Sequence, residues 1–336
     1  MGALLDVRGL TIAFPRAMPV RGLSLTVEPG ETVALVGESG SGKSLTALAL
    51  LRLLPERARI AAGEIHFAGR DLARLPDRDL RSVRGRDIAM VFQEPMTSLN
   101  PVLSVGQQII EVVRLHQGIS RRAARARAVE LLDLVRIPEP HRRVDEFPHE
   151  LSGGMRQRVM IAIAAACSPR LLIADEPTTA LDVTIQAQVL DLLDALRRDL
   201  GMALLLITHD LGVVAEWADR VAVMYAGRKV EEAPFEALFA APRHPYTRGL
   251  LQASPRLDAA HHYTSGPLSE ICGSITSSAF EAGCAFAPRC PLAHAACRVE
   301  VPALAPFVPG HLVACPVTTS VVPPRFEEVR RAAAVG

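Results

Sequence analysis

Gly37-Glu-Ser-Gly-Ser-Gly-Lys-Ser44 follows an apolar run, Thr32–Val36, and precedes a helical stretch. This octet has the pattern G-x-x-x-x-G-K-[ST] in the strand–loop–helix context in which the pattern binds nucleotide phosphates. Its glycines let the loop wrap tightly, so backbone N–H groups from about Gly40 to Ser44 point at a phosphate at a helix N-terminus. Lys43 supplies a cation between the β- and γ-phosphates, and the Ser44 hydroxyl is suited to Mg²⁺.

The composition indicates a globular chain and excludes several classes. The 336 residues are 49% hydrophobic and 22% charged, as in proteins with a substantial core. A net charge of +1 disfavours a nucleic-acid partner held by bulk charge. The longest apolar run, Val159–Cys167, has nine residues, whereas about 20 are needed to span a bilayer. The N-terminus has no basic region followed by an apolar stretch, so we expect a cytoplasmic protein.

Short apolar runs alternate with helical patterns from the start of the chain to about Phe235, which predicts an α/β fold with a largely parallel core sheet. Leu4–Phe14 and Leu23–Val27 alternate more loosely and predict an antiparallel flap. Residues 98–150 contain amphipathic stretches and no strand-like run, which indicates a helical insertion. The runs that we expect to be buried strands are Thr32–Val36, Ile88–Phe92, Leu171–Ala174, Ala203–Ile207 and Val221–Tyr225.

The character of the chain changes near residue 235. Five of the six cysteines and about half of the 25 prolines follow this point, which predicts a small, loop-rich extension without long helices. We therefore expect a nucleotide-binding domain over residues 1–238, with its helical subdomain at about 94–152, and an extension over residues 239–336.

Two carboxylates end the apolar run Leu171–Ala174. Ligands in open α/β sheets bind at the carboxyl ends of the strands, so Asp175 is placed to hold Mg²⁺ and Glu176 to polarise a water for attack on the γ-phosphate. Adjacent acids at a strand end are common, and this motif supports the nucleotide hypothesis without establishing it.

Leu151-Ser-Gly-Gly-Met155 opens a helix between these two motifs. Ser152 is a good N-cap, and Gly153 and Gly154 leave the first N–H groups unshielded, so this helix end is a second phosphate site. Together with the phosphate loop, the peptide resembles the signature of ATP-binding subunits of ABC transporters. The resemblance implies an ABC-type P-loop NTPase that forms a head-to-tail dimer with two ATP molecules, in which Ser152, Gly153 and Gly154 act in trans. Met155 stands where the family usually has glutamine.

The resemblance assigns roles to four further positions. Gln93 matches the glutamine that senses Mg²⁺, and Asp182 ends the loop Thr179–Asp182 that crosses the dimer interface. His209 matches the histidine that contacts the γ-phosphate, the alternative being a polar loop residue. Phe14 lies where the family places an aromatic ring on adenine, the alternative being a core residue of the flap.

The complete expected site has three sets of residues. Catalysis is assigned to Lys43, Glu176 and His209, and Mg²⁺ to Ser44, Gln93 and Asp175. The expected ATP-binding residues are Phe14, Gly37, Ser39, Gly40, Ser41, Gly42, Lys43, Ser44 and Gln93.

Residues 93–101 and 244–251 resemble the oligopeptide/dipeptide/nickel permease ATPases. This branch implies peptide uptake, with nickel chelates and glycans as alternative cargoes. It implies a second ATPase subunit (a paralogue or a second copy), two membrane permease subunits and an extracytoplasmic solute-binding protein, without nucleic acid. The chain would then sit on the cytoplasmic face of the inner membrane.

Two other classes of ABC protein fit the sequence less well. A soluble ABC ATPase of DNA repair would carry a long coiled coil between Gln93 and Ser152, and the segment between them is too short to hold one. ABC proteins of translation normally carry two nucleotide domains, and this chain has one.

Four cysteines, Cys284, Cys290, Cys297 and Cys315, lie close together near the end of the sequence. Disulfides are disfavoured in a cytoplasmic protein, which leaves metal or cluster binding as the next hypothesis. The spacing lacks the C-x2-C pairs of zinc modules, and four thiolates are able to hold a 4Fe–4S cluster. Residues 283–291 also resemble the peptide-permease pattern, some members of which resemble cluster-bearing proteins. The alternatives are zinc and free thiols.

Overall fold

An eight-stranded sheet forms the centre of the molecule, in the order β11-β12-β10-β9-β3-β8-β7-β6. The computed structural model describes residues 2–94, 98–179, 182–253, 271, 273–274 and 282–317. The core strands are β3 (Thr32–Val36), β6 (Ile88–Val91), β7 (Leu171–Asp175), β8 (Ala203–Thr208) and β9 (Arg220–Tyr225). They pair in parallel and are buried almost throughout. This confirms the prediction from the five apolar runs, because strands covered on both faces need apolar side chains at every position.

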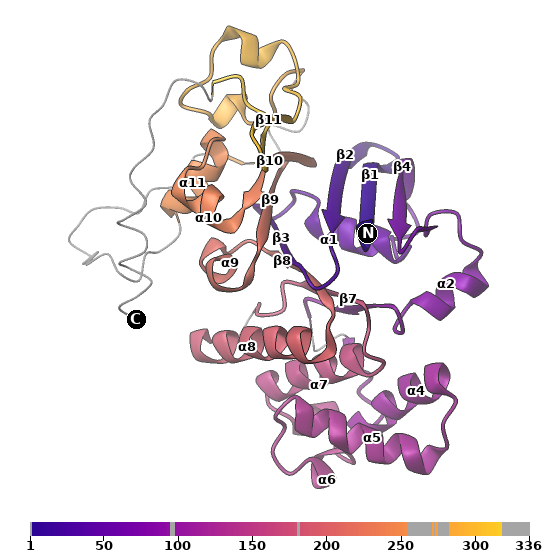
Figure 1. Ribbon diagram of the computed structural model, residues 1–336. Helices are drawn as coiled ribbons and strands as arrows, with labels where there is room; N and C mark the ends of the chain where they lie inside the picture. The colour runs from indigo at the N-terminus through magenta and orange to yellow at the C-terminus, as the bar shows by residue number, and fades with distance from the viewer. Residues whose placement is uncertain are drawn as a thin grey trace, which may run out of the picture.

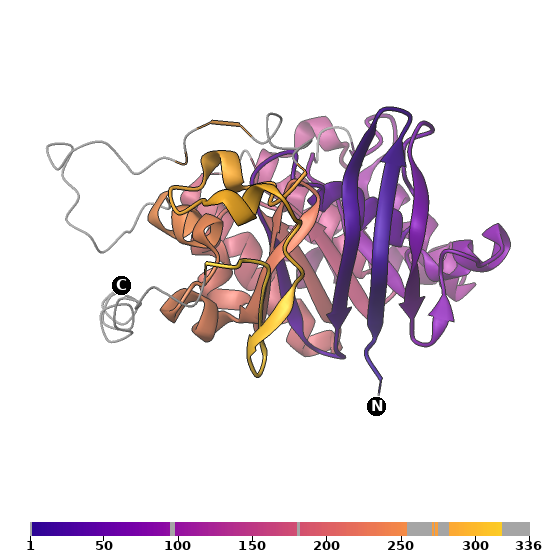
Figure 2. The same ribbon diagram turned by 90° about the horizontal axis from the view of Figure 1, so that it is seen from above.

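A second, antiparallel sheet packs beside the first and has the order β2-β1-β4-β5 (Figure 1). Its strands are β1 (Leu5–Phe14), β2 (Ala17–Val27), β4 (Arg59–Phe67) and β5 (Arg70–Asp71). The predicted flap is confirmed for β1 and β2, while β4 was missed because its first half is mostly exposed and has no strand-like alternation. Figure 2 shows the long strands of this sheet side by side.

Helices form a separate layer at one end of the molecule (Figure 1). The helical insertion contains α4 (Val105–Gln117), α5 (Arg121–Leu134) and α6 (Pro140–Arg143), and it leads into α7 (Gly153–Ala165). The apolar faces of α4, α5 and α7 join β6, β7 and α8 (Val183–Leu200) in one buried cluster. The prediction of helices without strands over 98–150 is confirmed.

The remaining helices cover the sheet. Residues from α1 (Lys43–Leu50) and α2 (Asp77–Val83) share a second buried cluster with the antiparallel sheet. A third cluster joins β9 and β10 (Arg228–Pro234) to the C-terminal elements. Its helices are α9 (Leu211–Trp217), α10 (Phe235–Ala240) and α11 (Pro245–Ala253).

The C-terminal extension is loop-rich, as predicted, but it also adds two strands to the main sheet. β12 (His311–Val313) pairs with β10, and β11 (Ala305–Val308) pairs with β12. Its other described elements include α11 and short 3₁₀ turns at Ala287–Arg289 and Ala295–Arg298. The boundary at residue 238 stays a prediction, and the sheet runs across it.

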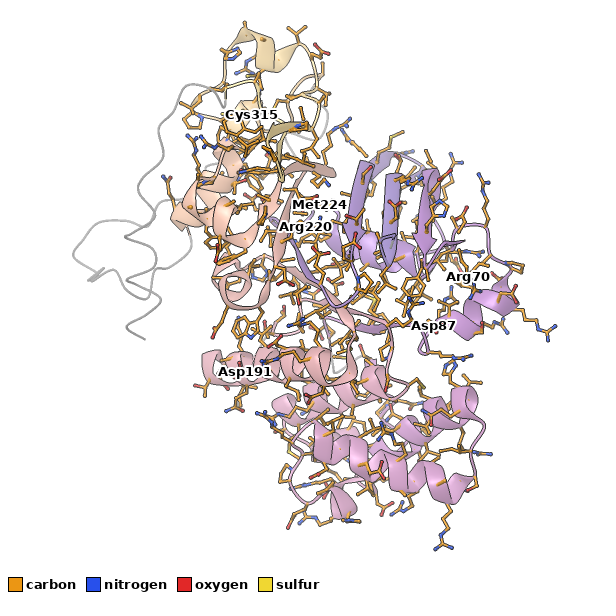
Figure 3. The ribbon with its side chains drawn as sticks, in the orientation of Figure 1. Arg70, Asp87, Asp191, Arg220, Met224 and Cys315 are labelled. Carbon is orange, nitrogen blue, oxygen red and sulfur yellow. The ribbon has the colours of Figure 1, made fainter. Side chains whose placement is uncertain are left out.

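Arg220, the first residue of β9, ties the two sheets together and is labelled in Figure 3. Its guanidinium donates to the Glu31 carboxylate at 2.9 Å and to the Thr26 carbonyl of β2 at 2.7 Å. It also pairs with Glu232 of β10. Because arginine has five donors in a rigid fork, one side chain fixes three segments near the start of β3.

Candidate nucleotide site

The phosphate loop leaves β3 and ends at Lys43, the first residue of α1. Two positions require glycine. At Gly37 a Cβ would lie 2.2 Å from the Met224 carbonyl oxygen, and at Gly42, with φ +99°, it would lie 2.5 Å from the Pro19 carbonyl oxygen. The close approach of β9 and β2 therefore sets the shape of the loop, which leaves its N–H groups at the start of a helix.

Lys43 lies folded against the loop and is 4% exposed. Its ammonium donates to the carbonyl oxygens of Gly37 at 2.6 Å and Glu38 at 3.1 Å. Burial lowers the pKa of Lys43, while the nearby charges of Glu176 and Asp175 act in the opposite direction. Two carbonyls hold this cation, and the Glu176 Oε1 lies 4.0 Å from it, so the ammonium is suited to an incoming phosphate.

Ser44 and Asp175 meet where Mg²⁺ would be held. The Ser44 Oγ donates to Asp175 Oδ1 at 3.0 Å, across 131 residues of sequence. Burial raises the pKa of Asp175 to about 6, an effect that the Ser44 hydrogen bond partly offsets. A hydroxyl beside a carboxylate that lacks a full counter-charge is a donor set that fits Mg²⁺, which prefers oxygen ligands.

Glu176 gathers three other side chains around one carboxylate oxygen. Its Oε2 accepts from Gln93 Nε2 at 2.9 Å and from Thr179 Oγ1 at 3.1 Å, and it lies 3.4 Å from His209 Nδ1. Its Oε1 lies 4.0 Å from Lys43 Nζ. The ends of β6, β7 and β8 thus place these side chains together, as expected for ligands at the carboxyl edge of a parallel sheet. Thr179 was not among the expected catalytic residues.

The signature peptide lies at the surface. Ser152 caps α7 by accepting from the Met155 N–H at 3.3 Å, and Ser152 and Gly153 are exposed. Met155 packs partly buried against the helical core. The N–H groups of this helix end are thus presented outward, where a second subunit would have access to them.

Asp182 also acts as a cap in this structure. Its carboxylate accepts from the Ile185 N–H at 2.9 Å and begins α8. Residues 180 and 181 of the predicted interface loop lie outside the described residues.

Phe14 lines an open cavity of about 570 Å³ at the turn between β1 and β2. The hypothesis that this ring stacks on adenine requires such a cavity, and Phe14 is half-buried. Three arginines that sequence reasoning missed share the wall: Arg16, Arg21 and Arg228. Arg228 comes from β10, far along the chain from Phe14, and no motif marks it.

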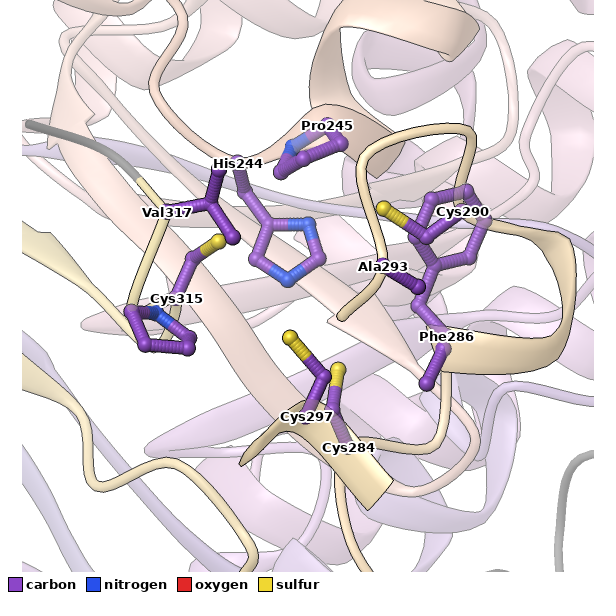
Figure 4. Close-up of a pocket in the computed structure, with 11 residues that line it drawn as sticks. His244, Pro245, Cys284, Phe286, Cys290, Ala293, Cys297, Cys315 and Val317 are labelled. Atoms are coloured by element: carbon purple, nitrogen blue, oxygen red, sulfur yellow. The ribbon is translucent and has the colours of Figure 1, made fainter. Parts of the chain in front are cut away.

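The four cysteines surround one small cavity of about 10 Å³ in the extension, together with the His244 ring (Figure 4). All four are thiols rather than disulfides. Burial raises the pKa of Cys284, Cys290 and Cys315, the last to about 11, and lowers that of His244 to about 4. The pocket therefore favours neutral thiols and a neutral imidazole.

This arrangement bears on the metal hypothesis for the cysteines. Within the described ranges no three His, Cys, Asp or Glu side chains are placed to hold one metal ion, so the thiols converge without forming a ligand set. Cys272 lies outside the described residues.

Two residues of the extension reach the phosphate loop and were missed as site residues. The Tyr246 hydroxyl accepts from the Glu38 N–H at 2.8 Å, and Arg289 donates to the Glu38 carboxylate at 2.8 Å. Both lie in segments that resemble the permease branch and carry no nucleotide-binding motif.

The fold and these motifs define an ATP-binding cassette, which combines a P-loop, an acidic strand end and a signature peptide. Family models agree along the chain. The ABC transporter model matches residues 20–179, and the C-terminal region of oligopeptide/dipeptide transporters matches residues 230–297.

Curated relatives cover nearly the whole chain. A putative peptide import ATP-binding protein of Brucella melitensis is 54% identical over 93% of this chain and 96% of its own. A probable peptide ABC transporter ATP-binding protein of Sinorhizobium fredii is 53% identical over 93% of this chain and 94% of its own.

Solved structures agree on the cassette. A dimeric ATP-binding cassette bound to ADP and phosphate superposes with a TM-score of 0.62 and 28% identity, covering 69% of this chain and 98% of the other. A subunit of an ABC transporter complex from Clostridium perfringens gives a TM-score of 0.61 and 27% identity over 71% of this chain and 91% of its own. The chain belongs to the ATP-binding subunits of ABC transporters, in the oligopeptide/dipeptide branch. No helix within its described part is long and apolar enough to cross a membrane.

Proposed function

We propose that this chain hydrolyses ATP to energise uptake of di- or oligopeptides by an ABC importer. The observation that carries the catalytic part is the convergence of Gln93, Thr179 and His209 on Glu176, at the edge of the sheet that also holds Lys43. The relatives named for peptide import and the match to the oligopeptide/dipeptide C-terminal region support the cargo class. Nickel chelates and glycans remain the alternative cargoes.

In the proposed reaction, water attacks the γ-phosphorus, the bond to ADP breaks and the water loses a proton. Glu176 accepts that proton or orients the water, while His209 and Gln93 fix the carboxylate through their contacts with Oε2. Lys43 neutralises charge on the β- and γ-oxygens. Ser44, Gln93 and Asp175 would hold Mg²⁺, which would supply further charge neutralisation. Arginines beside Phe14 would line the nucleoside part of the site.

We further propose that Ser152, Gly153 and Gly154 complete the site of a second ATPase subunit. The exposure of Ser152 and Gly153 at the start of α7 supports this arrangement, and the ADP-bound cassette that resembles this chain is dimeric. The partners proposed are a second ATPase, two permease subunits and an extracytoplasmic binding protein, with the chain attached peripherally to the cytoplasmic face of the membrane.

A trapping experiment tests this function. Tagged Glu176→Gln should bind ATP, fail to hydrolyse it and hold the closed dimer, so proteins that copurify from detergent-solubilised membranes are identified by mass spectrometry. Recovery of permease subunits and a peptide-binding protein supports import. Recovery of only soluble partners or nucleic acid overturns it. Glu176→Gln combined with Lys43→Ala is the matched control, because weakened nucleotide binding should prevent the closed, ATP-bound dimer from accumulating.

The 4Fe–4S cluster also stays a proposal. Four thiols on one cavity support it, whereas the raised pKa values of Cys284, Cys290 and Cys315 do not, and the described side chains are not placed as a ligand set. Iron and acid-labile sulfide are measured after anaerobic purification, beside a Cys290→Ser/Cys297→Ser variant. Stoichiometric iron and sulfide, lost in the variant, would support the cluster. Zinc alone or no metal would contradict it.

A further inference from the structure

Glu38, the second residue of the phosphate loop, is fixed at three points. Its carbonyl oxygen accepts from Lys43 Nζ at 3.1 Å. Its N–H donates to the Tyr246 hydroxyl at 2.8 Å, and its carboxylate receives the Arg289 guanidinium at 2.8 Å. Two of these three restraints come from the extension, which is remote from Glu38 in the sequence.

The two outside partners are themselves rigidly held. Tyr246 lies at the start of α11 and is completely buried, and burial raises the pKa of its phenol, so the hydroxyl stays neutral. The Arg289 side chain is 5% exposed and also donates to the Ile271 carbonyl at 2.8 Å and to the Tyr225 hydroxyl at 3.3 Å. A charge-assisted bond between partners this confined is stronger than an ordinary surface pair.

The same partners connect the loop to the cavity of the four cysteines. Phe286 lines that cavity, and its ring contacts those of Tyr225 and Tyr246 with centroids 5.2 and 5.4 Å apart. Arg289 directly precedes Cys290, which lines the cavity as well. The cavity wall and the restraints on Glu38 are thus one packed unit.

We propose that the C-terminal extension positions the phosphate loop for ATP, with Tyr246 and Arg289 as positioning residues, and that the state of the four-cysteine cavity and ATP binding are thereby coupled. This inference rests on the proposed nucleotide site. A loop whose Lys43 and Glu38 are prearranged loses less conformational entropy when the phosphates bind. Coupling of this kind acts in both directions: what changes the cavity changes ATP affinity, and ATP changes the cavity.

The first test uses the full-length chain and MgATP. Tyr246→Phe removes only the hydroxyl and leaves the Glu38 N–H without its partner, so we expect MgATP binding by calorimetry to weaken about fivefold to tenfold. Arg289→Gln should weaken it similarly, and Arg289→Lys should recover part of the loss because it keeps the charge. Arg248→Gln is the matched control, since Arg248 bonds the Pro242 carbonyl within the extension.

A double-mutant cycle separates positioning from general stability. Because Arg289 acts through the Glu38 carboxylate, Arg289→Gln and Glu38→Gln together should weaken MgATP no more than the stronger single change. We also expect KM for ATP to rise with kcat changed little. Additive losses, or a fall in melting temperature with wild-type affinity and KM in folded Tyr246→Phe, would overturn the proposal. If the unaltered chain itself fails to bind MgATP, the proposed nucleotide site is wrong. That outcome differs from one in which only the positioning role of Tyr246 and Arg289 fails.

The second test examines the reverse direction. Alkylation of Cys284, Cys290, Cys297 and Cys315 by N-ethylmaleimide is followed by mass spectrometry with and without MgATP. We expect MgATP to slow alkylation in the unaltered chain by more than twofold, and to have little effect in Arg289→Gln. Equal alkylation rates with and without MgATP, in a chain that binds MgATP, would contradict the coupling.

Discussion

Burial of the ionised Asp175 carboxylate destabilises the folded chain when no nucleotide is bound. The side chain is 4% exposed, and burial raises its pKa from 3.8 to about 6. Such a change is equivalent to about 3 kcal/mol, at about 1.36 kcal/mol for each pH unit. Because the unfolded chain ionises more readily, the native state is disfavoured by this amount above about pH 6, and the penalty disappears as the pH falls below 4.

Replacing Asp175 with asparagine removes the charge and keeps an oxygen that accepts from Ser44. After allowance for a weaker hydrogen bond of about 1 kcal/mol, the variant without nucleotide should gain about 2 kcal/mol of stability at pH 7.5. This gain corresponds to a rise of about 4 °C in Tm. At pH 4 the gain should vanish or change sign. MgATP should stabilise the unaltered chain but not the variant, because the Mg²⁺ ligand is lost.

Thermal unfolding in EDTA at the two pH values measures the gain, and repetition with MgATP measures the ligand effect. Asp191→Asn is the control, since Asp191 is exposed on α8 and its replacement should leave Tm unchanged. If Asp175→Asn lowers Tm at pH 7.5 by as much as at pH 4, the buried charge does not strain the fold and the reasoning fails.

Three other outcomes follow from the site and the fold. Gly42→Ala should abolish nucleotide binding and lower Tm by about 5 °C or more, because its Cβ would meet a backbone carbonyl at 2.5 Å. The control is Gly69→Ala, at φ +79° with open space around it, which should lower the free energy of unfolding by only about 1 kcal/mol. Glu176→Gln should lower ATPase turnover by about 10² to 10⁴-fold and leave MgATP affinity within threefold, measured by phosphate release and calorimetry. His311→Leu should destabilise the chain by about 1 to 3 kcal/mol in chemical unfolding, because it leaves the fully buried Glu231 carboxylate without its 2.7 Å partner.

Each of these has a result that would contradict it. Equal melting temperatures for the two glycine variants would mean that the loop is free to move away from β2. ATPase turnover near the wild-type rate in Glu176→Gln would mean that Glu176 takes no part in hydrolysis. An unchanged free energy of unfolding in the His311 variant would mean that water replaces the histidine at β12.

Local sequence patterns were sufficient to predict the strands at the core of the fold. Continuous apolar runs such as Thr32–Val36 marked the parallel strands because burial on both faces leaves no polar position. The antiparallel strand β4 was not predicted, because its first half is mostly exposed and does not alternate between apolar and polar residues. The strands β11 and β12 were not predicted either, because each is short and is stabilised by pairing with its neighbours in the sheet.

The residues proposed for catalysis were recognisable because each follows a strand or opens a helix, and parallel strands bring such positions to one edge. The order of Lys43, Gln93, Asp175, Glu176 and His209 along the chain was therefore enough to predict one site. Their distances, and the sharing of a single Glu176 oxygen, required the packed sheet.

The sequence of this protein determined its class, its core strands and most of its nucleotide site, because those features repeat short-range rules of burial, glycine conformation and helix capping. Packing between distant segments determined the rest. Arg289 and Tyr246 reach Glu38, four cysteines share one cavity, and Arg228 joins Phe14, although nothing local to these residues marks the contact. Such contacts depend on how the extension folds back on the core, which is fixed by long-range burial rather than by neighbouring residues.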